Sequence, residues 1–303
     1  MNNLRDLKSF SKNIKGKIFF DYDLKNTNWF NIGGTTEVYY KPESLNELVS
    51  FLKLFGSKEK IFVLGAGSNV LFSDNVFRGI IIKLGKNFSN ISLLSDNKLV
   101  AGSATIDKKL SEFACKNNIG GFEFLSCIPG TIGGGLKMNS GCFDREFKDI
   151  ILSIQAINKK GQIFTIPASK IKFIYRGNDL DNDLIFLSAS FKGKFKDQEL
   201  IQKNINFLKN KKDKSQPSKI KTGGSTFKNP KDQTQKKVWA LISKSVPMDT
   251  KFGGAEISQK HCNFFVNKNN ATFNDMKNLI NFVKQEVKSK TGINIETEIE
   301  IVE

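Results

Sequence analysis

The chain has 303 residues, of which 39% are hydrophobic and 25% are charged, and its formal net charge at pH 7 is +17. This length and composition support a globular protein with two or three domains. No apolar run approaches the roughly 20 residues that a membrane helix requires, and the charged N-terminus lacks the apolar segment of a signal peptide. We therefore expect no membrane span and a cytoplasmic location.

The positive charge comes almost entirely from lysine. Only four of the 47 basic residues are arginine: Arg5, Arg78, Arg145 and Arg176. Proteins that read nucleic acids usually use arginine for bidentate contacts. We interpret the lysine excess mainly as a bias in amino-acid composition, and a basic nucleic-acid-binding surface is the alternative.

The N-terminal 90 residues predict a small lobe that alternates strands with a helix. Residues 1–25 look like a loosely held basic leader. Ser44 and Glu47 form a capping box before a run of apolar residues at helical spacing. The elements expected here are strands at 37–40, 61–64 and 79–84 and a helix at 45–55. This β-α-β order predicts a first lobe over residues 26–90.

Residues 91–198 predict a second lobe with mainly antiparallel strands. Asp107 is expected to cap a helix, and Asn158–Gly161 has the composition of a hairpin turn. The strands expected here are 99–102, 151–157, 162–166 and 184–191. Few helices and antiparallel pairing make this lobe α+β.

The last hundred residues predict a separate domain, 199–303. A long amphipathic helix over 197–212 ends in a lysine-rich run, and the boundary lies there or just before it. Thr272 and Asp275 cap another helix, which Gly292 ends. The remaining elements expected are a helix at 238–244 and strands at 261–266 and 295–301.

Two glycine-rich turns are the strongest functional signals. The second glycine turn, Pro129–Gly135, holds four glycines and one proline in seven residues. Such a run suits a turn whose bare N–H groups point at an anion, with Asn139 adding a side-chain donor; a tight turn in a buried crossing is the alternative. The first glycine turn, Gly65–Asn69, follows a strand but lacks the third glycine and the helix of a Rossmann unit. Together the two turns match a pyrophosphate, which has two phosphates.

Three side chains are candidates for chemistry, each with a plain structural alternative. Arg176 could hold a carboxylate in two parallel bonds, or it could be a surface residue at a strand end. Ser225 follows two glycines and could donate a proton, or it could be a turn serine. Glu298 lies on the polar face of the last strand, which is also what a solvated acidic stripe looks like.

The cysteines and the single histidine do not suggest a site. Cys115, Cys127, Cys142 and Cys262 stand apart with no CxxC spacing, which argues against zinc and for reduced thiols. We interpret them as small buried residues without activating neighbours. His261 is expected to be structural, so a Ser-His-Asp hydrolase is poorly supported.

The two glycine turns, with the MNSG segment at 138–141, resemble the UDP-N-acetylenolpyruvoylglucosamine reductase family. The stretch GGSTFKNP at 223–230 is similar to that family's GS-x-F-x-NP segment, and the resemblance extends from about residue 26 to the C-terminus. It implies an α+β fold: a two-lobed FAD-binding region of the PCMH/vanillyl-alcohol-oxidase-like type plus a C-terminal α+β substrate domain.

The resemblance also implies roles for individual residues. Arg176, Ser225 and Glu298 become the catalytic residues, with Ser225 as the proton donor and Glu296 as the less favoured carboxylate. The departure Gly177-Asn178-Asp179 puts the loop after Arg176 in question. Lys214 and Asn229 are substrate-binding candidates, and no metal is expected. The residues implied to face FAD are Gly65, Ala66, Gly67, Ser68, Asn69, Pro129, Gly130, Thr131, Gly133, Gly134 and Asn139.

The implied reaction is the reduction of UDP-N-acetylglucosamine enolpyruvate to UDP-N-acetylmuramate, with FAD as cofactor and NADPH as hydride donor, in peptidoglycan precursor synthesis. We expect a monomer that binds no nucleic acid. Two alternatives remain. A flavoenzyme of the same fold would oxidise an alcohol or sugar, whereas a non-catalytic nucleic-acid-binding protein would be colourless and bind oligonucleotides in a salt-dependent way.

Overall fold

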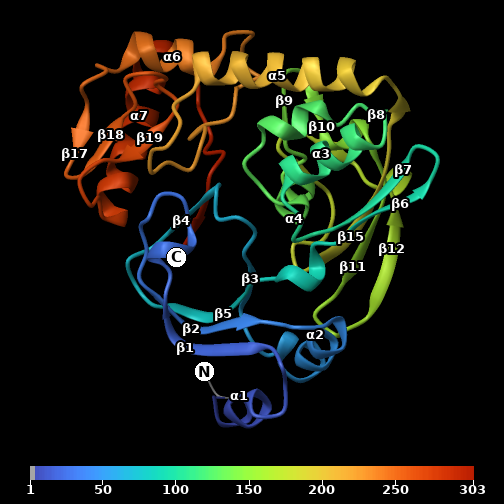
Figure 1. The fold of residues 1–303 in the computed structure, drawn as a ribbon. Coiled ribbons are helices and arrows are strands. Elements are labelled where there is room, and N and C mark those ends of the chain that lie inside the picture. Colours follow the sequence, from blue (N-terminus) through green and yellow to red (C-terminus); the bar gives the residue numbers. More distant parts are fainter. Residues whose placement is uncertain (1–3) are drawn as a thin grey trace. The chain divides into compact units, whose positions relative to one another are not determined.

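The computed structural model describes residues 4–303, and the chain forms two compact units (Figure 1). Unit 1 consists of the residues up to Asp21, Glu37–Ala66 and Arg78–Lys212. Unit 2 consists of Tyr22–Thr36, Gly67–Phe77 and Asp213–Glu303. Each unit therefore combines distant segments, whereas the sequence suggested consecutive domains.

The first sheet of unit 1 has the strand order β1-β2-β5-β3. Its strands are β1 (Lys17–Asp23), β2 (Thr35–Lys41), β5 (Phe77–Ile82) and β3 (Ile61–Val63). Helices α1 (Leu4–Ser11) and α2 (Leu45–Phe51), the latter continued by a π turn (Leu52–Gly56), accompany it. Leu7 is fully buried in a core that includes Tyr40 and Phe51. The expectation of a loosely held leader at 1–25 is wrong for its described part, which forms α1 and β1.

The start of α2 differs from the predicted reciprocal capping box. The Ser44 side chain accepts a hydrogen bond from the Glu47 N–H, as predicted. The Glu47 carboxylate instead accepts the N–H groups of Lys15, Gly16 and Glu43. This carboxylate therefore ties the segment before β1 to the start of α2.

The second sheet of unit 1 has the order β12-β11-β15-β7-β6, and all its pairs are antiparallel, as predicted. Its strands are β6 (Ile91–Ser95), β7 (Lys98–Gly102), β11 (Ile151–Ile157), β12 (Ile163–Pro167) and β15 (Ile185–Lys192). Helix α4 (Ile132–Lys137) packs against β7 and β15. Helix α3 (Asp107–Lys116) begins at Asp107 itself, with Ile106 as N-cap and no side-chain cap, so the predicted capping role of Asp107 is wrong.

The remaining elements of unit 1 are short, apart from one long helix. Helix α5 (Gln198–Ser215), which runs on to the first residues of unit 2, buries Ile201 and Ile205 against Cys115. The short elements are η3 (Lys86–Phe88), β8 (Ile119–Gly120), η4 (Glu123–Cys127), β9 (Gly141–Cys142), β10 (Arg145–Glu146), η5 (Phe147–Asp149), η6 (Ala168–Lys170), β13 (Phe173–Ile174), β14 (Gly177–Asn178) and β16 (Lys194–Phe195).

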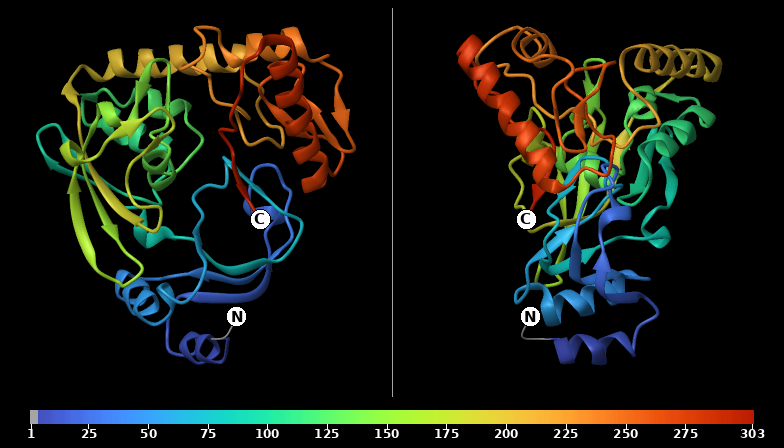
Figure 2. Two further views of the ribbon diagram at one scale, coloured as in Figure 1. Left: turned by 180° about the vertical axis from the view of Figure 1, so that it is seen from behind. Right: turned by 90° about the vertical axis from the view of Figure 1, so that its left-hand side faces the viewer.

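Unit 2 is built on a three-stranded sheet covered by a helix (Figure 2). The sheet has the order β17-β18-β19, and α7 packs against β17, β18 and α6. A separate parallel pair joins β4 to β20. The elements are η1 (Lys25–Thr27), β4 (Val70–Phe72), α6 (Val238–Ser245), β17 (Lys251–Phe252), β18 (Ala255–Ile257), β19 (Phe265–Asn267), α7 (Phe273–Thr291) and β20 (Glu300–Val302).

The limits of α7 agree with the sequence patterns. Thr272 and Asp275 form a reciprocal capping box, and Gly292 ends the helix in the left-handed region at φ 73°. The strands predicted at 261–266 and 295–301 are shorter than expected, since only the residues of β19 and β20 pair regularly. Among residues 4–303, no helix combines the length and the apolar character that crossing a membrane demands.

Candidate flavin and substrate site

The two glycine turns meet in unit 1. A Cβ built on Gly65 would lie 2.8 Å from Thr131 Oγ1 and 3.9 Å from the Gly134 Cα. A side chain at position 65 would therefore force the Thr131 side chain to shift, whereas the backbone at Gly134 is at ordinary contact distance. The structure thus brings together two of the segments that the sequence singled out separately.

Part of the second glycine turn is held by backbone hydrogen bonds. The Ile132 N–H donates to the Thr105 carbonyl at 2.9 Å, and the Gly133 N–H donates to the Ser103 carbonyl at 2.8 Å. These two N–H groups are therefore not bare, contrary to the reading from the sequence. They fix the position at which the turn enters α4.

Lys83, which sequence reasoning missed, lies beside the first glycine turn. Its Nζ donates a hydrogen bond to the Gly65 carbonyl. Burial, and then the charge of Lys41, lower the pKa of Lys83 to about 8. In the sequence Lys83 is an ordinary lysine directly after β5, with no local feature that marks it. Its placement puts a positive charge next to the turn that was expected to face a phosphate.

Asn139 stabilises the loop after α4. Its side chain is fully buried, and its amide donates to the Glu146 carboxylate at 3.0 Å and to the Ile174 carbonyl at 3.1 Å. Its side-chain oxygen accepts the Lys148 N–H at 3.0 Å. These bonds use both the donor and the acceptor of the Asn139 side chain, which therefore holds the loop in place.

Arg176 lies at the tip of the β13–β14 hairpin in a strained conformation. Its φ is 61°, a value that residues other than glycine seldom adopt. The guanidinium stacks over the Tyr175 ring at 4.8 Å and its Nη2 donates to the Gly141 carbonyl at 3.4 Å. Backbone strain of this kind concentrates at functional sites.

The residues that follow Arg176 have a clear structural use. The Asn178 amide donates to the carbonyls of Leu136 and Lys137, at the end of α4. The Asp179 carboxylate accepts the Lys172 N–H at 2.9 Å. The sequence departure after Arg176 therefore anchors the hairpin to the helix that follows the second glycine turn.

The end of the first glycine turn belongs to unit 2. Gly67 has φ 70°, and a Cβ there would come 2.2 Å from the Thr27 carbonyl oxygen, so only glycine fits. The Asn69 side-chain amide donates to the Glu298 carbonyl at 3.0 Å. Asn69 therefore positions the strand segment that carries a predicted catalytic carboxylate.

Ser225 lies in a tight turn that Asn263 holds. The Thr226 N–H donates to the Asn263 carbonyl at 2.7 Å, and the Asn263 side chain exchanges two hydrogen bonds with the backbone of Phe227. Gly224 before Ser225 has φ 81°. Asn263 is a positioning residue that sequence analysis missed. His261 accepts the Asn263 N–H, which agrees with the structural role predicted for it.

The surroundings of the two carboxylates favour Glu298 over Glu296. The Glu298 N–H donates to the Thr226 carbonyl at 2.8 Å, so Glu298 lies beside the Ser225 turn. The Glu296 side chain is 78% exposed and forms an ion pair with Lys228 at 3.6 Å. Glu298 is less exposed. A partly buried residue whose backbone bonds to the Ser225 turn suits catalysis better than a solvated ion pair.

The other predicted residues have simpler surroundings. Asn229 accepts the Val238 N–H at 2.9 Å at the start of α6, and Lys214 is exposed near the end of α5. Gly130 packs on Asp107, whose carboxyl oxygen would be 2.7 Å from a Cβ at position 130. Ala66, between Gly65 and Gly67, and Ser68, directly after Gly67, are partly exposed.

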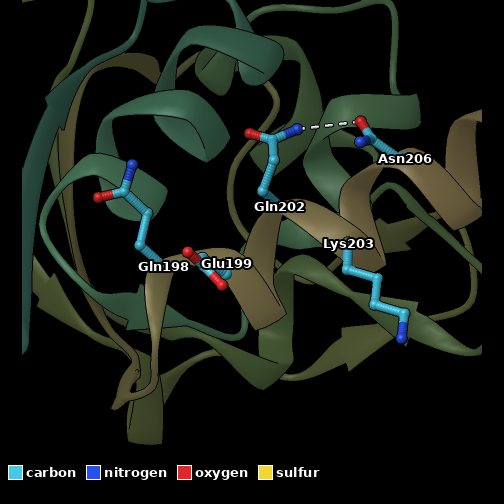
Figure 3. Close-up of a pocket in the computed structure, with 5 residues that line it drawn as sticks. All are labelled: Gln198, Glu199, Gln202, Lys203 and Asn206. Carbon is cyan, nitrogen blue, oxygen red and sulfur yellow. Dashed lines mark hydrogen bonds between the residues drawn. The ribbon is translucent and has the colours of Figure 1, made fainter.

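A shallow hollow of about 430 Å³ lies elsewhere, on the first half of α5 (Figure 3). Its lining residues are Gln198, Glu199, Gln202, Lys203 and Asn206. Gln202 donates to Asn206 across one turn of the helix at 3.0 Å. None of the predicted site residues lines this hollow, and its side chains form no catalytic grouping.

Comparison with known proteins agrees with the site. Residues 36–167 match the model of an FAD binding domain, and this range contains both glycine turns. The fold and site therefore define an FAD-dependent oxidoreductase. Residues 216–302 match the C-terminal domain of UDP-N-acetylenolpyruvoylglucosamine reductase.

Full-length relatives narrow the class further. The chain is 65% identical to the UDP-N-acetylenolpyruvoylglucosamine reductase of Pelagibacter ubique over 99% of both chains. It is 44% identical to that of Rickettsia akari, over 95% of this chain and 97% of the relative. The crystal structure of the enzyme from Thermus caldophilus superposes with a TM-score of 0.81 at 26% identity, covering 96% of this chain and all of that one. The chain belongs to the UDP-N-acetylenolpyruvoylglucosamine reductase family, which confirms the predicted fold class.

Proposed function

We propose that this chain reduces UDP-N-acetylglucosamine enolpyruvate to UDP-N-acetylmuramate, with NADPH as hydride donor, in the synthesis of peptidoglycan precursors. The observation that carries the proposal is the union of an FAD-binding region and this family's C-terminal domain in one chain that aligns with its relatives from end to end. An alcohol- or sugar-oxidising flavoenzyme would not require that C-terminal domain.

The residues of unit 1 fit FAD. The two glycine turns lie in contact, with Gly65 against Thr131 and Gly134, and Lys83 adds a cation beside the first turn. Closely approaching backbone and a nearby positive charge suit a pyrophosphate. Bound FAD supplies the hydride chemistry between NADPH and the carbon–carbon double bond of the substrate.

Arg176 and Glu298 act on the substrate carboxylate. Hydride addition to one vinyl carbon places negative charge on its neighbour and, through conjugation, on the carboxylate. The guanidinium of Arg176 binds that carboxylate with two parallel bonds, a geometry that lysine does not offer. Glu298 helps to orient and polarise the same group, which is electrostatic stabilisation by preorganised charges.

Ser225 completes the reaction by donating its hydroxyl proton to the carbon that carries the developing charge. The turn set by Gly224 and held by Asn263 fixes the direction of the hydroxyl. Lys214 and Asn229 bind the UDP side or the carboxylate side of the substrate. The free thiols are consistent with work in the cytoplasm, where we propose that the protein acts as a monomer.

The proposal is tested by following NADPH oxidation with and without UDP-N-acetylglucosamine enolpyruvate and by identifying the product by mass spectrometry. The Ser225→Ala variant then tests whether Ser225 is the proton donor. We expect it to keep flavin reduction by NADPH nearly unchanged and to slow the substrate half-reaction by roughly 10²–10⁴-fold. The matched control is Ser243→Ala, a serine that bonds only within α6. Equal slowing of both half-reactions in Ser225→Ala would contradict the role.

A further inference from the structure

One cysteine precedes the second glycine turn, and another follows the helix into which that turn leads. Cys127 ends η4, two residues before Pro129, and Cys142 lies in β9 directly after Gly141. Strand β9 packs against η4, and Cys142 Sγ donates to the Phe124 carbonyl at 3.3 Å. Phe124 and Cys127 belong to the same short helix, so this bond places Cys142 beside the segment that carries Cys127.

Positive charge surrounds this pair. Lys212 Nζ donates to the Cys127 carbonyl at 2.7 Å. The nearby Cys142 thiol, the Ser126 hydroxyl, and the charges of Lys212 and Lys209 together lower the pKa of Cys127 to about 6, although burial opposes the change. The same contact with Cys127, together with burial, raises the pKa of Cys142. One sulfur is thus disposed to be a thiolate and its neighbour to remain a thiol.

The other two cysteines serve as an internal comparison. Cys115 Sγ donates to the Gln198 carbonyl and Cys262 Sγ to the Trp239 carbonyl. Burial raises the pKa of both thiols. Neither has a second cysteine beside it among the residues that the structure describes. The expectation that no cysteine has an activating neighbour is therefore wrong for Cys127 alone.

We infer that Cys127 and Cys142 form a dithiol modification site that reacts with hydrogen peroxide. Cys142 is partly exposed and gives the small oxidant a way in, whereas Cys127 is 6% exposed. The inference concerns thiol chemistry and does not depend on the proposed reduction of an enolpyruvyl ether.

The reaction proceeds in two balanced steps. The Cys127 thiolate attacks one peroxide oxygen, the O–O bond breaks, and the departing hydroxide takes a proton to become water, leaving a sulfenic acid. The Cys142 sulfur then attacks Cys127 Sγ, an S–S bond forms, and the sulfenic oxygen leaves as water with the Cys142 proton. The two thiols lose two electrons and peroxide gains them. A dithiol reductant reverses the change.

A disulfide between Cys127 and Cys142 would affect the candidate site. The disulfide would close a loop that contains the whole second glycine turn. It would also restrain Gly141, whose carbonyl accepts the hydrogen bond from Arg176. Oxidation therefore acts on the segment that enters α4 and on the residue that binds the substrate carboxylate.

The test is to treat the reduced, full-length holoprotein with hydrogen peroxide, block free thiols with N-ethylmaleimide, and map the peptides by mass spectrometry. We expect a Cys127–Cys142 crosslink that a dithiol reductant removes. Cys142→Ser should instead accumulate a sulfenic acid at Cys127 that dimedone traps, and Cys127→Ser should lose both products. Cys262→Ser is the matched control and should crosslink like the natural protein.

A second measurement needs no variant. Iodoacetamide should alkylate Cys127 in the folded natural protein with half-maximal rate near pH 6, and at pH 7 at least about tenfold faster than Cys115 or Cys262. The inference is overturned if the folded protein forms no crosslink, or if Cys115 and Cys262 are oxidised and alkylated as fast as Cys127.

Discussion

The side-chain amide of Asn69 donates a 3.0 Å hydrogen bond to the backbone carbonyl of Glu298. The Asn69 carbonyl in turn accepts the Glu300 N–H at 2.9 Å, and the Glu298 N–H reaches the Thr226 carbonyl at 2.8 Å. One hydrogen-bond ladder in unit 2 therefore joins the end of the first glycine turn, the candidate carboxylate and the Ser225 turn. A shift of Asn69 should therefore displace Glu298 and the Ser225 turn.

The first prediction is that Asn69→Ala lowers kcat by roughly tenfold to a hundredfold while the flavin content stays unchanged, because a misplacement of about 1 Å costs that much. Stopped-flow measurement of the substrate half-reaction checks it. The matched control is Asn97→Ala, which removes an amide-to-carbonyl bond of 2.9 Å to Gly193 in unit 1. The control should lose a similar stability, about 1 kcal/mol, and keep its kcat. Equal kcat values for the two variants would contradict the positioning role.

The second prediction concerns Arg176→Lys. Lysine keeps the charge but cannot form two parallel bonds with a carboxylate. We expect kcat/KM for the enolpyruvyl substrate to fall by at least about tenfold, while flavin reduction by NADPH is unaffected.

Arg145→Lys provides the comparison for this substitution. Arg145 forms an exposed ion pair with Asp149, four residues along, at 3.2 Å. Such surface pairs contribute about 0–1 kcal/mol, so the variant should behave like the natural protein. If Arg176→Lys also retained full kcat/KM, carboxylate binding by Arg176 would be excluded.

Much of the fold was accessible from local patterns. The limits of α7 follow from Thr272, Asp275 and Gly292, whose capping chemistry acts within a few residues. The antiparallel sheet of unit 1 follows from alternating strands joined by a hairpin turn at Asn158–Gly161. These signals depend on neighbours in sequence, so they can be recognised without knowledge of the tertiary structure.

The interleaving of the two units was not accessible in this way. The pairing of β4 with β20 joins residues more than 200 positions apart, and three-residue strands have no distinctive pattern of their own. The same limit applies to Lys83 and Asn263. Each is ordinary in its local sequence, and only the tertiary structure brings it to a glycine turn or to the Ser225 turn.

The third prediction is a pH dependence set by Asp107. This carboxyl is fully buried, neither of its oxygens finds a hydrogen-bond donor in the described part of the chain, and burial raises its pKa well above 3.8. The unfolded chain ionises there near pH 4, whereas the folded protein keeps the proton. The free energy of unfolding should therefore fall as the pH rises from about 4 toward the raised pKa.

Asp107→Asn should remove this loss, so that its Tm relative to the natural protein increases as the pH rises. Asp275→Asn supplies a contrast of opposite sign. Hydrogen bonding to the Thr272 N–H lowers the pKa of Asp275, so its contribution is present above the unfolded pKa and is lost as the pH falls through the folded value. Thermal melts from about pH 2 to pH 8 decide both. A Tm difference for Asp107→Asn that does not change with pH would contradict the assignment.

The fourth prediction is that Lys83 makes FAD binding depend on pH. Its pKa of about 8 means that it is charged at neutral pH and neutral above that value. Since a pyrophosphate favours the charged form, the Kd for FAD should rise above pH 8. Lys83→Met should bind FAD more weakly at pH 7 and should lack this pH dependence, as flavin fluorescence titrations would show.

Lys41→Met tests the cause of the lowered pKa. The charge of Lys41 contributes to lowering the pKa of Lys83, after burial. Its removal should raise that pKa and move the loss of FAD affinity to higher pH. An unchanged midpoint would mean that another group titrates.

The central claim is most directly tested by the visible absorption spectrum of the purified protein under anaerobic conditions. We expect a flavin spectrum that NADPH bleaches and that UDP-N-acetylglucosamine enolpyruvate restores. A flavin that bleaches but is not restored by this substrate would contradict the proposed reaction and leave the FAD-binding fold intact. A colourless protein that takes up no added FAD would contradict the account as a whole.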